Sequence, residues 1–504
     1  MDENQVSYNY EPIQHDQVRL VKLNHDSDRI LAVFKTFALE GPAPPYHALS
    51  YSWLSESPAN DATGEYHVLK TGKEQLRVLN TVHAFFRVLM LKGAGPDDTW
   101  WWINSNYINL ANVKERSQQV QLMGQIYLNA HSVIIWLGEE SNHIDRAVDL
   151  SNCSTKQSGS KHTSWFRRDS PHFSATSLPA TLGCLTSLFQ RRWWSRTWTL
   201  QEYAMSANAS FWWGLRSVSR FAVEGALIAA DQCTSVAFKG APAFRHGFSR
   251  RRVQMLHKKG QAKANKLHMS LVALAAYSSC FEATDDRDRL YGIKGLATDS
   301  CFLDVDYSYG VEDTYLRFAG AFIEHYKSLD VICFASIYSS LPGSALPSWV
   351  PNWRARIDPL SVPLMVSQSA KTHIGNLRHF ALAIEEPSNP SPCYAASKVS
   401  AAIYTFKGSK LVARGTIVFF DTVVRMSLRL MVIRSGRIGL VSEKVRKGDL
   451  VGVLFGCSVP VLLRQSGDEG DGTFTFVGEC FLDGFMNGEG VGGDDCPERD
   501  FCIE

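Results

Sequence analysis

A strand–helix–strand unit between residues 100 and 138 constrains the fold of this chain more than any other stretch. Residues 100–103 form a short apolar run that predicts a buried strand. Asn112 is placed to cap a helix in which apolar side chains then recur at helical spacing. Residues 133–138 are apolar, β-branched and ended by glycine, which predicts a second strand. Two strands joined through a helix imply parallel pairing and a right-handed crossover, so we expect an α/β fold.

The chain divides into three regions that differ in their predicted secondary structure. Its 504 residues exceed what one hydrophobic core usually supports. Strand and helix signals alternate over residues 10–215, in which the polar stretch 151–180 is expected as a loop or insertion. Residues 216–385 are expected to be mostly helical, with an amphipathic helix at 311–326. Residues 393–504 show short β-type runs between glycine and polar turns, which predicts a β-rich module with an acidic tail.

Composition excludes several function classes. The net charge of +2 gives no strong electrostatic attraction to nucleic acid or membranes. A basic cluster at 245–266 can serve nucleic-acid binding or nuclear import, but no stacking aromatics are interleaved, which favours a solvated face. The polar N-terminus lacks a secretory signal, and the apolar run 270–281 is too short to span a bilayer, so we expect a cytoplasmic protein without a transmembrane segment.

Familiar enzyme motifs do not account for the chain. We find no Walker A loop, no H-E-x-x-H and no G-x-S-x-G motif in the sequence. Residues 488–493 fit G-x-G-x-x-G by letter, yet they lie in the acidic tail with no helix signal after them. The fifteen histidines show no ligand spacing with cysteine or acid, so we expect no metal site.

Two ordered blocks carry a family resemblance. Residues 46–53 read Tyr-His-Ala-Leu-Ser-Tyr-Ser-Trp, and a second block follows from residue 102 to residue 138. In this order and spacing they resemble the signature of the fungal heterokaryon-incompatibility (HET) domain. The signature residues of the second block are Trp102, Glu115, Arg116, Gln119, Trp136 and Gly138.

Further blocks extend the resemblance over most of the chain. Residues 283–292 resemble the "ATDPRDKVYAL" block of these proteins, and residues 346–353 resemble their "LPSWVPDW". Other matches are the lead-in at 10–12 and parts of the C-terminal module. The chain also departs from the family. Its second block replaces an acid, a cysteine and a glutamine of "WIDAICINQ" by Asn104, Tyr107 and Leu110, and Leu54 replaces the glycine that usually ends the first block.

The resemblance also implies a site. HET domains are suspected relatives of TIR domains, which are small doubly wound α/β units, and some TIR domains cleave NAD with one glutamate. That glutamate sits four residues after a tryptophan, a spacing that Trp198 and Glu202 reproduce. By this resemblance Glu202 is the catalytic candidate. Because ligands bind beyond the carboxyl ends of parallel strands, side chains there are ligand-binding candidates. They are Ser50, Tyr51, Trp53 and Asn104. Trp198 joins them as a ligand-binding candidate through its spacing from Glu202.

Structural roles compete with each of these assignments. Glu202 can pair with Arg196 or cap a backbone instead of performing catalysis. The tryptophans of the signature can be core aromatics, because tryptophan buries a large apolar area. For Glu115 and Arg116, an intramolecular salt bridge is favoured over a ligand contact. Arg287 and Asp288 are expected to tie the domains together.

Three functions follow from the resemblance. The first is self/non-self recognition in a filamentous fungus, in which the protein triggers cell death in vegetative incompatibility. The second is a TIR-like NAD or nucleotide hydrolase, with NAD as substrate and no bound cofactor. The third is a non-catalytic interaction scaffold, of a kind that can be encoded beside a biosynthetic cluster. The altered positions Leu54, Asn104 and Tyr107 favour this function over catalysis. Protein partners or self-association are expected in each case, and no specific nucleic acid.

Overall fold

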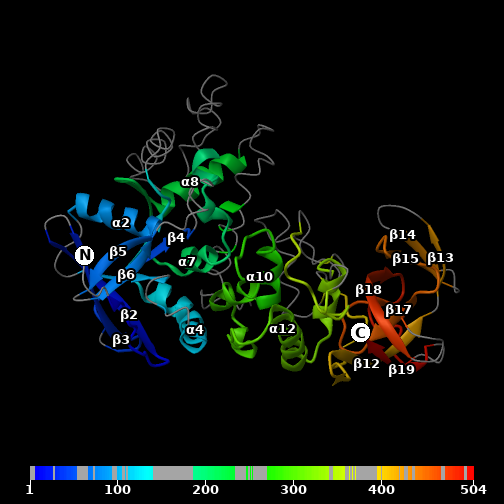
Figure 1. Ribbon diagram of the computed structural model, residues 1–504. Coiled ribbons are helices and arrows are strands. Elements are labelled where there is room, and N and C mark those ends of the chain that lie inside the picture. Colours follow the sequence, from blue (N-terminus) through cyan, green and yellow to red (C-terminus); the bar gives the residue numbers. More distant parts are fainter. Residues whose placement is uncertain are drawn as a thin grey trace.

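The computed structural model describes residues 6–139, 186–232, 270–357 and 394–504, each with short gaps, and a few isolated residues between them. The expected loop at 151–180 and most of the basic cluster lie outside the described residues, as do Leu54, Tyr107 and Leu110. Figure 1 shows the chain running from N-terminal strands, through short helices, to a second β-rich unit at the opposite end of the molecule.

The described N-terminal residues form a ten-stranded sheet with the order β1-β6-β5-β3-β2-β7-β4-β8-β9-β10. Its bounds are β1 Val6–Ser7, β2 Gln17–Asp26, β3 Arg29–Ala38, β4 Tyr46–Tyr51, β5 Tyr66–Thr71, β6 Glu74–Leu79, β7 Trp100–Ile103, β8 Ser132–Trp136, β9 Ala209–Trp213 and β10 Arg216–Ser219.

The centre of this sheet is parallel, as the α/β prediction requires. Strand β4 pairs in parallel with β7 on one side and with β8 on the other, and β8 pairs in parallel with β9. The strand–helix–strand prediction was wrong in one detail, because β7 and β8 do not pair with each other and β4 lies between them. Strands β2 and β10 add antiparallel pairs on the two sides, so the sheet is mixed.

Alternate side chains of a strand point to opposite faces of the sheet, and the parallel strands carry apolar side chains on both faces. Helices therefore cover both faces. Leu49, Ile103 and Ile134 pack in the core cluster of helix α2 (Asn80–Leu91), whereas Ala48 and Trp102 pack in that of helix α4 (Val113–Asn129). Figure 1 shows α2 and α4 on opposite sides of the strands. The Asn112 side chain caps α4, accepting hydrogen bonds from the backbone N–H groups of Lys114 and Glu115.

The middle region contains short helices joined by irregular chain. The 3-10 turn η3 (Arg192–Ser195) leads into helix α7 (Thr199–Met205), and helix α8 (Arg220–Gln232) follows the first sheet. The further described helices are α10 Leu271–Tyr277, α11 Asp288–Tyr291 and α12 Val311–Tyr326. The further described 3-10 turns are η4 Lys294–Leu296, η5 Ser300–Phe302 and η6 Asp330–Ser336. The amphipathic helix expected at 311–326 is confirmed as α12.

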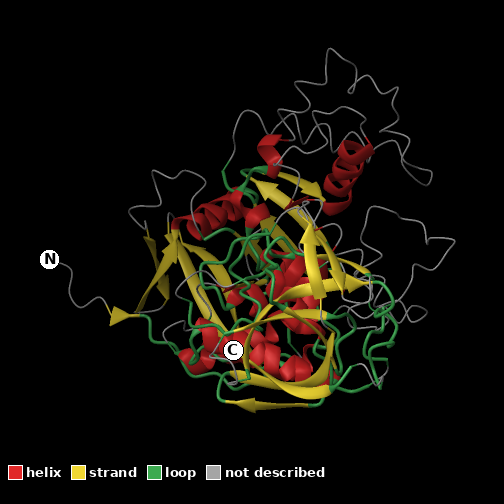
Figure 2. Ribbon diagram, turned by 90° about the vertical axis from the view of Figure 1, so that its right-hand side faces the viewer, coloured by secondary structure: helices red, strands yellow, loops and turns green. Residues whose placement is uncertain are grey.

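The C-terminal region is β-rich, as expected, and forms a nine-stranded, barrel-like sheet among the described residues. Seen from this end in Figure 2, its strands lie in front of the helices of the middle region. The bounds are β11 Tyr404–Lys407, β12 Lys410–Val418, β13 Phe420–Val424, β14 Arg429–Ile433, β15 Ile438–Val441, β16 Leu450–Leu454, β17 Val461–Gln465, β18 Thr473–Leu482 and β19 Glu498–Ile503.

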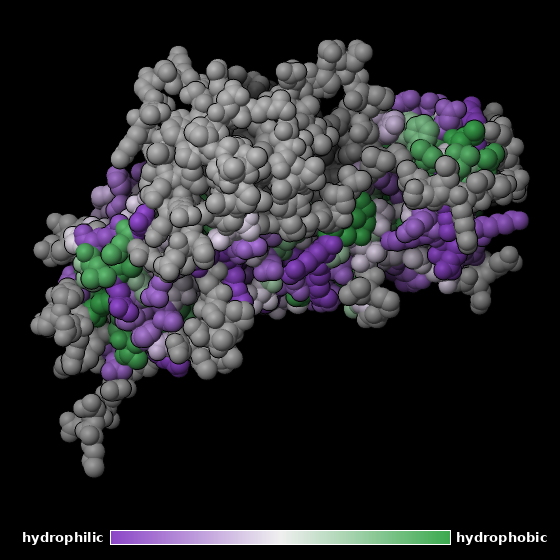
Figure 3. Space-filling view, turned by 90° about the horizontal axis from the view of Figure 1, so that it is seen from above, coloured by the Kyte–Doolittle hydropathy of each residue, from purple (hydrophilic) through white to green (hydrophobic). Residues whose placement is uncertain are grey.

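One large hydrophobic cluster joins the three regions, since it contains Val18 of the first sheet, Phe318 of α12 and Ile503 of the last strand. Figure 3 shows hydrophilic and hydrophobic groups interspersed on the upper face, with hydrophobic groups gathered near both ends. Every helix among the described residues falls short of the length and hydrophobicity that a membrane span requires.

Candidate active site

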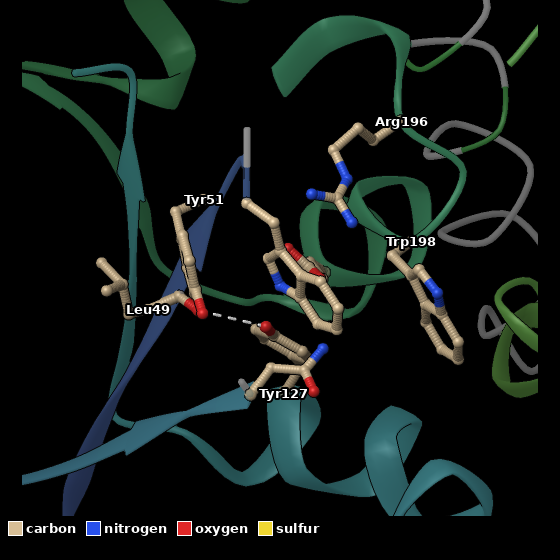
Figure 4. Close-up of a pocket in the computed structure, with 8 residues that line it drawn as sticks. Leu49, Tyr51, Tyr127, Arg196 and Trp198 are labelled. Carbon is tan, nitrogen blue, oxygen red and sulfur yellow. Dashed lines mark hydrogen bonds between the residues drawn. The ribbon is translucent and has the colours of Figure 1, made fainter. Parts of the chain in front are cut away.

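A small pocket opens at the carboxyl ends of the parallel strands β4 and β7. Its empty volume, including the open mouth, is about 230 Å³. Figure 4 shows side chains from the sheet, from α4 and from the chain before α7 around one common space. The lining residues are Leu49, Tyr51, Trp53, Asn104, Tyr127, Arg196, Trp198 and Glu202.

Glu202 lies in the first turn of α7, and its side chain is buried against the pocket. The Ser50 hydroxyl donates a hydrogen bond to Glu202 Oε2, and Trp193 Nε1 in turn donates to Ser50 Oγ over 2.7 Å. Burial raises the pKa of the Glu202 carboxyl to about 7, against the opposing effects of the Ser50 hydrogen bond and nearby arginine charges. A carboxyl group with this pKa is poised for proton transfer near neutral pH.

Arg196 is the cation of the pocket lining. Its guanidinium points into the pocket in Figure 4, and its Cζ lies 5.3 Å from the centre of the Trp53 ring. Burial lowers the pKa of Arg196, while the charge of Glu202 acts in the opposite direction. In turn, the Arg196 charge favours the ionised form of Glu202. A cation and an acid therefore face the same small space.

Aromatic rings and an amide form the rest of the wall. Tyr51 and Trp198 are buried, Trp53 is half-buried, and the Asn104 amide reaches the same pocket. The Tyr127 hydroxyl donates to the carbonyl of Leu49 over 3.2 Å, the bond drawn in Figure 4. The structure thus brings Tyr51, Trp53, Asn104, Trp198 and Glu202 together around the pocket, with Ser50 directly behind Glu202.

The remaining signature residues support the fold around the pocket. Trp102 and Trp136 are core aromatics, and Gly138, two residues after the end of β8, has a φ of 100°, which favours glycine. Glu115 forms an ion pair with Arg19 over 3.1 Å.

Two further signature side chains bridge segments of the chain. Arg116 pairs with Asp285 of the middle region over 3.0 Å. Gln119 Nε2 donates to the carbonyl of Gln17 over 2.7 Å, which ties α4 to the start of β2.

Arg250 is a residue of the site that sequence reasoning missed, because it was counted with the basic cluster as a solvated side chain. It is buried and donates hydrogen bonds to the carbonyls of Trp193, Trp194 and Arg196 at 2.8 to 3.1 Å. Its guanidinium carbon lies 4.4 Å from the centre of the Trp193 ring. Arg250 therefore holds the turn that leads into α7. No local pattern distinguishes it from its basic neighbours.

The chemistry available in the pocket follows from these groups. A carboxyl group near its midpoint of ionisation at neutral pH can stabilise developing positive charge or transfer a proton. Flat aromatic rings beside it can pack against a planar heterocycle. Among the described residues, no group of three or more His, Cys, Asp or Glu side chains is placed to hold a metal ion.

Two regions of the chain match known protein families. Residues 46–202 match the family described as heterokaryon incompatibility protein (HET), and residues 385–502 match the Het-6 beta-barrel domain. The Neurospora crassa protein named heterokaryon incompatibility protein 6, OR allele, is 26% identical over 377 residues, covering 63% of this chain and 54% of the relative. The chain thus spans about half the length of this curated relative. No solved structure matches the chain.

Proposed function

We propose that this chain, which is a HET-domain protein, acts in vegetative incompatibility of a filamentous fungus, where contact between unlike partners triggers cell death. The match of both terminal regions to HET-family domains supports this role, as does the relative named for heterokaryon incompatibility. In this proposal the protein works in the cytoplasm and acts through protein partners or self-association.

The biochemical activity we propose is cleavage of NAD or a related nucleotide in the manner of TIR domains. The observation that carries it is the buried Glu202 carboxyl, which faces a pocket at the carboxyl ends of parallel strands. A doubly wound sheet with its site at this edge is what a TIR-like unit requires. Trp198 stands four residues before Glu202 and lines the same pocket.

The proposed reaction breaks the bond between the ribose C1 atom and the nicotinamide nitrogen. The nitrogen leaves with the bonding electron pair as neutral nicotinamide, and positive charge develops on the ribose. The Glu202 carboxylate stabilises that charge, and water then adds to C1 and releases one proton, giving ADP-ribose. Arg196 keeps a fraction of Glu202 ionised at neutral pH, because its charge opposes the effect of burial.

The same pocket weighs against a non-catalytic scaffold. A scaffold has no need of an open pocket that joins Asn104 to Glu202, nor of a buried carboxyl held by Ser50. The departures at Asn104 and at the positions around it change what can be bound. They leave Glu202, Trp198 and Arg196 in place.

Expression in a fungal host tests this function. We expect the wild-type protein to lower both viability and cellular NAD, and Glu202→Ala to restore both. Glu324→Ala is the matched control, because Glu324 is an exposed acid on α12 and should leave the effect intact. Equal toxicity of wild type and Glu202→Ala at equal protein levels would contradict a catalytic role for the pocket.

A further inference from the structure

A segment of the middle region, outside the matched residues 46–202, is attached to the pocket wall by its backbone. Glu282 N–H donates to the carbonyl of Ser195 over 2.7 Å, and Thr197 N–H donates to the carbonyl of Glu282 over 2.9 Å. This isolated parallel bridge holds the backbone of Arg196, the cation of the pocket. The chain that leads into α7 is therefore fixed from outside the HET match.

Asp288, in the first turn of α11, makes the second attachment. Its Oδ2 accepts a hydrogen bond of 2.9 Å from Nε1 of Trp198, and its Oδ1 accepts one of 2.5 Å from the Tyr307 hydroxyl. The Trp198 ring lines the pocket on its other side. Asp288 is only 7% exposed, and a buried carboxylate is retained at a cost that its hydrogen bonds must offset.

The neighbours of Asp288 hold this arrangement in one orientation. The guanidinium carbon of Arg116 lies 3.5 Å from the centre of the Tyr307 ring, and Arg116 is itself paired with Asp285. Gly292 leaves space for the Trp198 ring, because a Cβ atom there would come within 3.3 Å of Trp198 Cδ2 and within 2.8 Å of the Asp288 carbonyl. The middle region therefore shapes one wall of the pocket.

From these contacts we propose that Asp288 is a positioning residue for the pocket, acting through Trp198, and that the site is shared between the HET match and the middle region. This inference rests on the proposed function of the pocket for its catalytic consequence. Trp198 would then present its ring to the planar part of a nucleotide at an angle that Asp288 sets. Asp288 itself touches no substrate.

If Asp288 acts through Trp198, its loss should affect substrate binding more than the bond-breaking step. Asp288→Ala removes the acceptor of the Trp198 Nε1 hydrogen bond but leaves Glu202 and Ser50 as they are, so we expect the KM for NAD to rise about five- to tenfold while kcat changes less than twofold. Asp286→Ala is the matched control. Asp286 lies two residues away and pairs with Arg289 over 3.0 Å, so its KM should stay at the wild-type value.

An assay that does not depend on activity follows the Trp198 indole N–H by NMR in the full-length protein, labelled with 15N-tryptophan and assigned with Trp198→Phe. Burial raises the pKa of Asp288 to about 6. We expect the Trp198 signal to shift with a midpoint near that pH in wild type and in Asp286→Asn, and to lose this titration in Asp288→Asn. Tyr307→Phe removes a hydrogen bond that lowers the pKa of Asp288, so the midpoint should move upward.

The outcomes separate this inference from the catalytic proposal. If neither the wild type nor the variants release nicotinamide but the Trp198 signal behaves as described, the positioning role of Asp288 stands and the proposal of NAD cleavage is refuted. If Asp288→Asn does not fold, the upward shift in Tyr307→Phe decides the question. A Trp198 signal that does not change with pH in the folded wild type, and that Asp288→Asn and Tyr307→Phe leave unaltered, would overturn the inference. An unchanged KM in an active Asp288→Ala protein would overturn it as well.

Discussion

The carboxyl group of Glu202 is buried in the wall of the pocket, although water solvates a carboxylate strongly. Burial raises the pKa of Glu202 from 4.5 to about 7. In the unfolded chain the same group ionises near its ordinary pKa, so the folded state holds the extra proton between these two pH values. Stability therefore falls as pH rises from about 4.5 to about 7, and stays lower above that range.

The first prediction at this scale concerns stability. A shift from 4.5 to about 7 corresponds to about 3 kcal/mol, so Glu202→Gln should be more stable than wild type by up to that amount at pH 8. The two proteins should be similar at pH 4.5. Chemical denaturation at both pH values measures this difference. A Glu202→Gln protein that is less stable at pH 8 would indicate a structural ion pair in place of an active-site acid.

The second prediction concerns the charge of Arg196, which opposes the effect of burial on Glu202. Arg196→Gln should move the pKa of Glu202 further upward, and the acidic limb of the pH profile for nicotinamide release should move with it. Arg317→Gln serves as the control, because Arg317 is an exposed residue of α12 that stacks on Tyr309. An unmoved acidic limb in Arg196→Gln would separate Arg196 from the ionisation of Glu202.

At the scale of elements, α4, α7 and η4 meet at a contact that glycines make possible. The N–H of Gly295 in η4 donates to Gln201 Oε1 of α7 over 2.9 Å. A Cβ atom on Gly295 would lie 2.7 Å from that oxygen and 3.0 Å from the Cα of Gly124 in α4. Because Gln201 precedes Glu202, this contact helps to fix the helix that carries the carboxyl group.

Gly295→Ala should therefore push η4 away from α4 and α7 and destabilise the protein by roughly 1–3 kcal/mol, as overpacking does. Gly310→Ala is the control, because a Cβ atom there meets only Asp313 Oδ2 at 3.6 Å. The melting temperatures of the two variants test this expectation. Equal melting temperatures would show that the contact is not close packed.

Local sequence patterns predict individual elements of this fold but not their order in the sheet. The cap at Asn112 and the span of α12 follow from local patterns, and both are present in the structure. The insertion of β4 between β7 and β8 follows from no local pattern, because strand order depends on long-range packing. The spacing of Trp198 and Glu202 indicated the pocket, but its supports Arg250 and Asp288 come from segments about 50 and 90 positions away.

At the scale of the whole molecule, residues 46–202 share strand pairing, polar contacts and core packing with segments outside this range. Strand β7 pairs with β2, which precedes this match, and β8 pairs with β9, which follows it. Arg116 and Trp198 both bond to the middle region. The cluster that packs beneath α4 continues into α12 and the last strand.

A fragment of residues 46–202 should therefore expose apolar surface and fail to fold. We expect it to be cleaved rapidly in limited proteolysis and to show no cooperative thermal transition by circular dichroism, whereas the full chain shows both protection and cooperativity. A fragment that melts cooperatively would mean that the middle region is dispensable for this part of the fold.

The central claim, that Glu202 lies in an active pocket for nucleotide cleavage, is tested most directly by release of nicotinamide from NAD by purified protein. The assay uses wild type and Glu202→Ala in matched, self-associated samples. We predict steady release of nicotinamide and ADP-ribose by the wild type and at least about a hundredfold loss in Glu202→Ala, as expected for removal of the carboxylate that stabilises the developing positive charge. No release from well-folded, self-associated wild type, or equal release by Glu202→Ala, would contradict the claim.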